Sequence, residues 1–218
     1  MKPSIIILTY NSADSIRDTL AAASQVSDDI HIVDSYSSDE TLAIAQSFGV
    51  TVVQHAFEDY GRQRNWAMDN IALKYSWQLH LDADEVLSPA LIDEINSLTD
   101  DTPLAGFFVP RFLKFLGRVL THGGMSPTWH LRLFKTGLAR CEARLYDQHF
   151  FLTSGEAGKL REPLIDNVVM SLSEWTSRHN RWSDLEVKEI CLQETESRIV
   201  PAVFGDPVQR KRFQRGLY

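Results

Sequence analysis

The sequence has no apolar run long enough to cross a membrane. Its first apolar stretch, Ile5 to Leu8, is much shorter than a signal-peptide core or a membrane span. The most apolar longer segment, residues 104–120, carries three basic side chains and Pro110, which would break a continuous helix. We therefore expect a protein that is neither exported nor embedded in a membrane.

The sequence also has few cysteines and no excess of positive charge. Cys141 and Cys191 form no C-x-x-C pair, so the sequence suggests neither a zinc site nor a disulfide framework, and a reducing cytoplasm fits best. The net charge of −7 argues against nucleic acid as a partner, because that affinity depends on Lys and Arg neutralising phosphates. The 218 residues have ordinary globular composition, with 44% hydrophobic and 23% charged residues, and should fold as one domain or a domain with a short appendage.

Two nucleotide-binding fingerprints are missing. No G-x-G-x-x-G follows the first apolar run, and no G-x-x-x-x-G-K-[ST] occurs, which disfavours dinucleotide oxidoreductases and P-loop enzymes. His122, His130 and His149 lack the H-x-x-x-H spacing of a zinc site. Each is expected to serve as a hydrogen-bonding side chain.

The first hundred residues alternate between strand-like and helix-like patterns. Strands are expected over residues 4–9, 30–33, 50–53 and 77–81, with helices after Ser12, over 41–48 behind a Ser37–Glu40 capping box, over 60–71 despite Gly61, and after Ser88 with Pro89. Such alternation predicts an α/β fold with a mainly parallel, doubly wound sheet. Ligands bind at the carboxyl ends of the strands in such sheets.

The second half of the chain has a different pattern. Strands are expected over residues 106–112 and 130–134, as an extension that makes the sheet mixed, with a loop from Gly117 to Thr128 between them. Apolar residues at three- and four-residue spacing predict an amphipathic helix from Ser171 to about Glu196.

Polar residues gather where three of the expected strands end. Asp82 and Asp84 follow the fourth strand, where paired carboxylates can hold Mg²⁺ or Mn²⁺ on a substrate diphosphate; the alternative is a solvated turn. Asp34 follows the second strand and suits a ribose or base contact, or an Asx-turn. Thr9, Tyr10 and Asn11 follow the first strand, where they could flank a base or form ordinary turn chemistry.

Four motifs in the first hundred residues resemble the family 2 glycosyltransferases, which have the GT-A fold. They are Ile6-Ile7-Leu8-Thr9-Tyr10-Asn11, Ile32-Val33-Asp34-Ser35 with Ser38-Asp39-Glu40-Thr41, Arg64-Asn65 with Ala67, and Leu81-Asp82-Ala83-Asp84-Glu85. The resemblance implies that Asp34 contacts the nucleotide and that Asp82 and Asp84 hold the metal and diphosphate. It places Arg64 and Asn65 in the nucleotide-sugar site as well.

The second half is similar to a bacterial branch of that family that assembles lipopolysaccharide cores and exopolysaccharides. The matching residues are Gly123-Gly124, His130-Leu131-Arg132-Leu133-Phe134, Tyr146-Asp147-Gln148-His149, Asp166-Asn167, Leu172-Ser173-Glu174-Trp175 and His179-Asn180-Arg181-Trp182-Ser183. By this resemblance Asp147 is the general base, although relatives more often have a second acid where Gln148 stands. Arg132 is expected either to contact phosphate or to form a structural ion pair.

The resemblance implies an inverting transfer from a nucleoside-diphosphate sugar to a glycan or lipid-linked acceptor. It divides the chain into a catalytic domain, residues 1–170, with a nucleotide-sugar half (1–100) and an acceptor half (101–170), and a helical appendage, 171–218. Similar proteins continue past Arg215-Gly216-Leu217-Tyr218 with a membrane-associating segment. Arg210, Lys211, Arg212 and Arg215 suit either a peripheral contact with the inner membrane or a solvated tail.

Two other functions fit parts of the sequence. A metal-dependent nucleotidyltransferase would also use paired acids on a diphosphate, but it normally needs a glycine-rich, basic loop after the first strand, and Thr9-Tyr10-Asn11-Ser12 is neither. A sugar-nucleotide-binding protein that has lost catalysis is the other alternative. Release of nucleoside diphosphate from a sugar donor distinguishes the glycosyltransferase from both.

Overall fold

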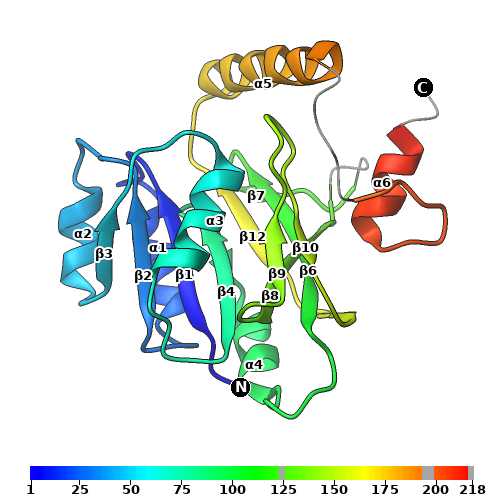
Figure 1. Ribbon diagram of the computed structural model, residues 1–218. Coiled ribbons are helices and arrows are strands. Elements are labelled where there is room, and N and C mark those ends of the chain that lie inside the picture. Colours follow the sequence, from blue (N-terminus) through cyan, green and yellow to red (C-terminus); the bar gives the residue numbers. More distant parts are fainter. Residues whose placement is uncertain (123–125, 193–198, 216–218) are drawn as a thin grey trace.

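One mixed sheet forms the centre of the molecule in the computed structural model, which describes residues 1–122, 126–192 and 199–215 (Figure 1). In chain order the elements are β1 (Ser4–Thr9), α1 (Ile16–Ala23), β2 (Ile30–Asp34), α2 (Thr41–Ser47), β3 (Thr51–Gln54), α3 (Tyr60–Asn70), β4 (Trp77–Asp82), β5 (Glu85–Leu87), α4 (Pro89–Ser97), β6 (Gly106–Phe115), β7 (Arg118–Val119), β8 (Thr128–Lys135), β9 (Ala139–Cys141), β10 (Phe150–Leu152), β11 (Ala157–Lys159), β12 (Leu164–Val168), α5 (Leu172–Leu192) and α6 (Pro207–Arg215).

The sheet has a parallel half and a mixed half. Its strand order is β3-β2-β1-β4-β8-β6-β12-β5, and β7 and β11 pair with β6. The first four strands in that order run parallel, and β8 is antiparallel to both β4 and β6. The predicted α/β class, the parallel N-terminal sheet and its mixed extension are confirmed.

Alternating side chains of β1 bury both faces of the sheet. Ile5 and Ile7 pack into the main core with residues of α1, α2 and α4. Ile6 and Leu8 pack on the other face with residues of α3. A strand covered on both faces has no polar alternation, which is why residues 4–9 form a continuous apolar run.

One of the three helix caps predicted from the sequence is present in the structure. Ser88 caps α4 as predicted, because its Oγ accepts a hydrogen bond from the Leu91 amide at 3.1 Å, and Pro89 is the first helical residue. The predicted caps of the first two helices are wrong. α1 begins at Ile16, four residues after Ser12, and α2 has no side-chain cap because the Ser37 hydroxyl donates to Asp34 instead.

The second half contains more strands than the sequence pattern indicated. β6 and β8 extend the two predicted strands, and Pro110 lies within β6. Short strands β5, β9, β10, β11 and β12 were not predicted, because runs of three to five residues carry too little periodicity. Most of the predicted 117–128 loop is described, but Gly123 and Gly124 lie outside the described residues.

Two helices form the C-terminal segment. α5 confirms the predicted amphipathic helix as far as Leu192, and the rest of that prediction, up to Glu196, falls outside the described residues. A reciprocal capping box starts α5, because Ser171 and Glu174 each accept a hydrogen bond from the other's backbone amide. Within the described ranges no helix is long and apolar enough to span a bilayer. Of the predicted basic tail, Gly216 to Tyr218 are not described.

Candidate active site

Three of the candidate positions lie at the same edge of the sheet because β2, β1 and β4 are parallel neighbours. Thr9 pairs with Asp34, and Leu8 pairs with Asp82, so the strands end in register. Two strand spacings separate Asp34 from Asp82, about 10 Å. This edge lies beneath α5 in Figure 1.

Asp82 is held by two arginines that come from distant parts of the chain. Its Oδ1 accepts from Nη2 of Arg64 on α3 at 2.8 Å, and its Oδ2 accepts from Nη2 of Arg132 on β8 at 2.9 Å. Burial favours the neutral acid, but these two positive charges outweigh it and hold the pKa of Asp82 well below its usual range. Asp82 is therefore an ionised, rigidly oriented carboxylate, and the ion pair considered for Arg132 in the sequence is present.

Glu85 continues the same charge network inside the protein. Its Oε1 accepts from Arg132 Nη2 at 2.5 Å, and its Oε2 accepts from the Asp82 backbone amide at 3.0 Å. β5, which begins at Glu85, pairs antiparallel with β12, so Asp166 lies opposite Glu85. Arg111 on β6 bridges these two acids at 3.6 Å and 3.3 Å.

Among the described residues no arginine forms an ion pair with Asp84, and this carboxylate lies close to other acids. Its backbone carbonyl is fixed by the Asn167 amide at 2.8 Å. Burial and the charges of Asp166, Asp82 and Glu85 raise the pKa of Asp84 to about 7. A cation placed beside this carboxylate would stabilise its ionised form.

These features fit a divalent cation. Both aspartates present oxygen ligands, which Mg²⁺ and Mn²⁺ prefer, and Asp84 is buried beside other acids, so a cation there would favour its ionised form. In the described part of the chain, no group of three or more metal-binding side chains comes together. The aspartates would therefore need further ligands from water or from a substrate diphosphate.

The residues at the end of β1 and β2 form a compact turn. Asp34 is fully buried, and its carboxylate accepts from the amide and hydroxyl of Ser37 at 2.9 and 2.5 Å and from Gln54 at 3.1 Å. Asn11 has a left-handed backbone, with φ of 45°, and accepts from the Ser38 amide at 2.8 Å. The Asx-turn considered for Asp34 is thus present, and its predicted nucleotide contact stays a prediction.

Thr9 and Tyr10 differ sharply in exposure. Tyr10 is 61% exposed, whereas Thr9 is buried and its Oγ1 has no hydrogen-bond partner among the described residues. Tyr10 is therefore free to contact a planar ligand group, as the sequence predicted for this turn.

Asn65 connects α3 to β9. Its amide nitrogen donates to the Cys141 carbonyl at 2.9 Å, and its amide oxygen accepts from the Cys141 amide at 3.0 Å. Gly61 lies one turn earlier, where an added Cβ would come within 2.2 Å of the Glu142 carbonyl oxygen. In this structure Asn65 fixes α3 to the backbone of β9, and its direct contact with the donor remains a prediction.

Asp147 lies in the loop between β9 and β10 with a left-handed backbone, φ 55°. The His149 ring bonds to its carbonyl oxygen at 2.7 Å, and Lys211 Nζ lies 3.5 Å from its carboxylate. The His149 ring stacks on that of His130, with centroids 5.4 Å apart. The sequence predicted that the histidines would serve as hydrogen-bonding side chains. For His130 and His149 this is confirmed, because the ring of each has a polar contact within 3.2 Å.

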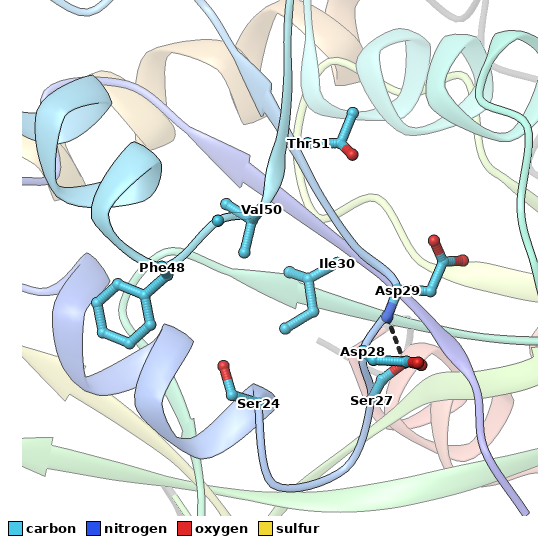
Figure 2. A pocket seen from close by; sticks show the side chains of 9 residues that line it. Ser24, Ser27, Asp28, Asp29, Ile30, Phe48, Val50 and Thr51 are labelled. Carbon is cyan, nitrogen blue, oxygen red and sulfur yellow. Dashed lines mark hydrogen bonds between the residues drawn. The ribbon is translucent and has the colours of Figure 1, made fainter.

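A hollow lies at the opposite end of the parallel strands. A depression of about 330 Å³ lies where β2 and β3 begin, lined by residues that include Ser24, Asp28, Phe48 and Thr51 (Figure 2). Its walls come from the amino ends of parallel strands, away from Asp82 and Asp84. It is therefore separate from the candidate active site.

Comparison with known families agrees with this geometry. Residues 4–166 match the family described as Glycosyl transferase family 2, which includes every candidate site residue. The chain belongs to this family.

Its curated relatives differ in how much they share with this family 2 chain. An uncharacterized glycosyltransferase of Rickettsia bellii is 38% identical over 94 residues, which is 43% of this chain and 31% of the relative. The chain thus matches about a third of the length of this relative. The lipopolysaccharide core biosynthesis glycosyltransferase LpsC of Rhizobium meliloti is 24% identical over 201 residues, 87% of this chain and 73% of the relative.

Solved structures confirm the GT-A fold. TarS of S. aureus in complex with UDP-GlcNAc has a TM-score of 0.59 at 16% identity, over 78% of this chain and 60% of that one. The mannosyltransferase PcManGT of Pyrobaculum calidifontis, in complex with GDP-Man and Mn²⁺, has a TM-score of 0.57 at 14% identity, over 90% and 66%.

Sequence reasoning gave no site role to several residues of the family 2 site. Arg111 and Asp166 reach it through strand pairing of β6 and β12, and neither periodicity nor composition marks them. Tyr60, the first residue of α3, lies near enough for Asp82 and Asp84 to raise the pKa of its phenol, although burial is the larger cause. Asp166-Asn167 matches a motif of the family, and this motif is the signal that could have identified Asp166 as a site residue, whereas no motif covers Arg111.

Proposed function

We propose that this chain transfers a sugar, with inversion, from a nucleoside-diphosphate sugar to a hydroxyl of a glycan or lipid-linked acceptor. The observation that carries the proposal is the pair Asp82 and Asp84 at the end of β4, within a family 2 chain. Asp82, held by two arginines, and Asp84, buried beside other acids, suit a metal-bound diphosphate.

A divalent cation, Mg²⁺ or Mn²⁺, would be held by Asp82 and Asp84, and when bound it would neutralise the charge of the leaving diphosphate. The Mn²⁺ in the complex of the mannosyltransferase neighbour supports this choice. Tyr10, Asn11, Thr9 and Asp34 would border the nucleotide. Arg64 and Arg132 would keep Asp82 oriented, and Asn65 would keep the acceptor side in place.

Asp147 is the proposed general base. It would take the proton of the acceptor hydroxyl while that oxygen bonds to the anomeric carbon and the bond from this carbon to the diphosphate breaks on the opposite face. Glu85 is poorly suited to this task, because both of its oxygens are engaged by Arg132 and the Asp82 amide.

Synthesis of a bacterial lipopolysaccharide core or another cell-surface polysaccharide is the proposed setting. The likeness to LpsC over most of both chains supports it. Residues 1–170 would form the catalytic domain and 171–218 an appendage, working in the cytoplasm. A peripheral membrane contact would use Arg210, which is exposed, because Arg212 is buried in its ion pair with Glu142.

The test is a panel of sugar nucleotides incubated with the protein and Mn²⁺, with nucleoside diphosphate release as the measured quantity. The expected outcome is slow hydrolysis of one donor, faster with a suitable acceptor, and loss of both on chelation of the metal. A chain that releases nucleoside diphosphate from no donor would contradict the proposal.

A further inference from the structure

Helix α5 crosses the edge of the sheet at which the candidate site lies (Figure 1). It follows directly from β12, the strand that carries Asp166, and it contacts the body of the protein at both ends. Near its start Trp175 packs against Phe115 of β6, with ring centroids 5.6 Å apart. Near its end Glu189 accepts a hydrogen bond from Arg144 at 2.6 Å. The helix is therefore anchored over the site at two points.

Arg178 lies on the inward side of α5, between these anchors. Its guanidinium lies over the Trp182 ring, 4.8 Å from the ring centroid, which fixes the plane of the group. Trp182 in turn packs against Tyr146, the neighbour of Asp147, with ring centroids 5.8 Å apart. Arg178 is thus a positioned cation between the aspartates and the loop of the proposed base.

Each of the other arginines of the site forms an ion pair with an acid of the site. Arg64 binds Asp82, Arg132 binds Asp82 and Glu85, and Arg111 bridges Glu85 and Asp166. The Nε of Arg178 is buried without a hydrogen-bond partner among the described residues, as is the Nε of Arg132. Arg132 nevertheless binds two carboxylates, whereas Arg178 has no ion pair among the contacts of the described residues. Burying an unsatisfied guanidinium nitrogen costs free energy, so an external acceptor is expected.

The field of Arg178 reaches the metal-binding edge. Its positive charge counteracts the rise in pKa of Asp166, for which burial is the larger cause. Arg178 therefore faces the carboxylates from the helix side, at a distance longer than an ion pair. A group with several anionic oxygens could bridge this gap.

We propose that Arg178 binds the diphosphate of the sugar donor from the side opposite Asp82 and Asp84. The inference rests on the proposed function and adds a binding residue from the C-terminal segment to it. A planar guanidinium suits two phosphate oxygens at once, and Trp182 holds it in the required plane. Helix α5 then covers the leaving group once the donor is in place.

The experiment compares four full-length chains by titration calorimetry with UDP, GDP, CDP and ADP in the presence of Mn²⁺. They are wild type, Arg178→Gln, Arg178→Lys and the matched control Arg181→Gln, whose side chain is exposed on the same helix. Arg178→Gln should weaken binding of the preferred nucleotide by about 10- to 100-fold, as expected for lost charge-assisted hydrogen bonds. Arg178→Lys should recover part of the affinity, and Arg181→Gln should match wild type.

Three results would overturn the inference. Wild-type affinity in Arg178→Gln would remove Arg178 from the diphosphate while leaving the proposed function intact. An equal loss in Arg181→Gln would assign the effect to the net charge of the helix. A wild-type chain that binds none of the four nucleotides would contradict the proposed function itself. Unchanged melting temperatures of all variants confirm that the fold is retained in the comparison.

Discussion

Arg212 of α6 and Glu142, which follows β9, form a buried two-pronged ion pair. Nη1 lies 2.7 Å from Oε1 and Nη2 lies 2.6 Å from Oε2. Glu142 also accepts from the His149 amide at 3.1 Å, and Arg212 Nη2 lies 3.4 Å from the Asp147 carbonyl oxygen. This pair joins the last described helix to the loop that carries the proposed base.

Arg212→Met should therefore destabilise the protein strongly. Removing one member of a buried ion pair leaves the other charge without compensation, at about 3–5 kcal/mol. The measurement is the free energy of unfolding by urea. Arg210→Met, at an exposed position of the same helix, is the control and should change stability little.

The double variant Arg212→Met with Glu142→Gln separates lost charge from lost packing. It should regain part of the stability, because no unpaired charge remains in the interior. A double variant as unstable as the sum of the single ones would indicate that the pair itself has little importance.

Asp84→Asn should leave the fold intact and abolish metal-dependent stabilisation. With a pKa near 7, the ionised form of Asp84 is disfavoured in the folded chain, so a neutral Asn should not lower the melting temperature in metal-free buffer. Mn²⁺ should raise the melting temperature of wild type and of the exposed control Asp93→Asn, but not of Asp84→Asn. A full Mn²⁺ effect in Asp84→Asn would remove the proposed metal site.

His149 makes a measurable contribution to the pH dependence of stability. Burial is the main reason that its pKa is lowered to about 4 from the ordinary 6.5. The unfolded chain therefore takes up a proton below pH 6.5 that the folded chain rejects until about pH 4. Stability from this residue is complete above pH 6.5 and is lost as the pH falls toward 4, by roughly 3 kcal/mol in all.

The test is a comparison of wild type with His149→Asn, since other groups titrate in the same range. Asn can still donate to the Asp147 carbonyl, but it takes up no proton. The stability advantage of wild type should shrink as the pH falls from 6.5 to 4. The exposed control His122→Asn should run parallel to wild type. A constant difference between wild type and His149→Asn would contradict a lowered pKa.

Sequence predicted the parallel half of the fold well because its signals are local. Continuous apolar runs mark strands buried on both faces, and Ser88 with Pro89 marks a helix start whose partners are neighbours in the chain. Because these strands were predicted to be parallel, Asp34 and Asp82 could be placed at the same edge of the sheet. This placement did not require side-chain contacts to be predicted.

The rest of the site depends on contacts between distant residues, which no local pattern encodes. Arg132 meets Asp82 because β8 pairs with β4, and Asp166 meets Glu85 because β12 pairs with β5. Gly61 counted against a helix in the sequence, yet α3 needs it there for the close approach of the Glu142 carbonyl. Ser37 had the spacing of a helix cap, but Asp34 competes for its hydroxyl.

The identity of the general base is the most demanding prediction. Asp147→Asn should lower the rate of transfer to an acceptor by roughly 10²- to 10⁴-fold, the usual contribution of a positioned base, with little change in donor or metal affinity. The His149 ring and Arg212 Nη2 contact the Asp147 carbonyl oxygen and should still hold the loop when the side-chain charge is removed. The measurements are the transfer rate and, in parallel, the affinity for the donor nucleotide with Mn²⁺.

Glu85→Gln is the companion variant, and it should behave in the opposite way. Glu85 is fully buried and bound to Arg132, so the change should disturb Asp82 and weaken the binding of donor and metal. Binding and chemistry should therefore separate between the two variants, because Asp147 acts on the acceptor hydroxyl and Glu85 supports the leaving-group side. Near-normal transfer by Asp147→Asn would assign the base to another residue, and Glu85 would then be the next acid to test.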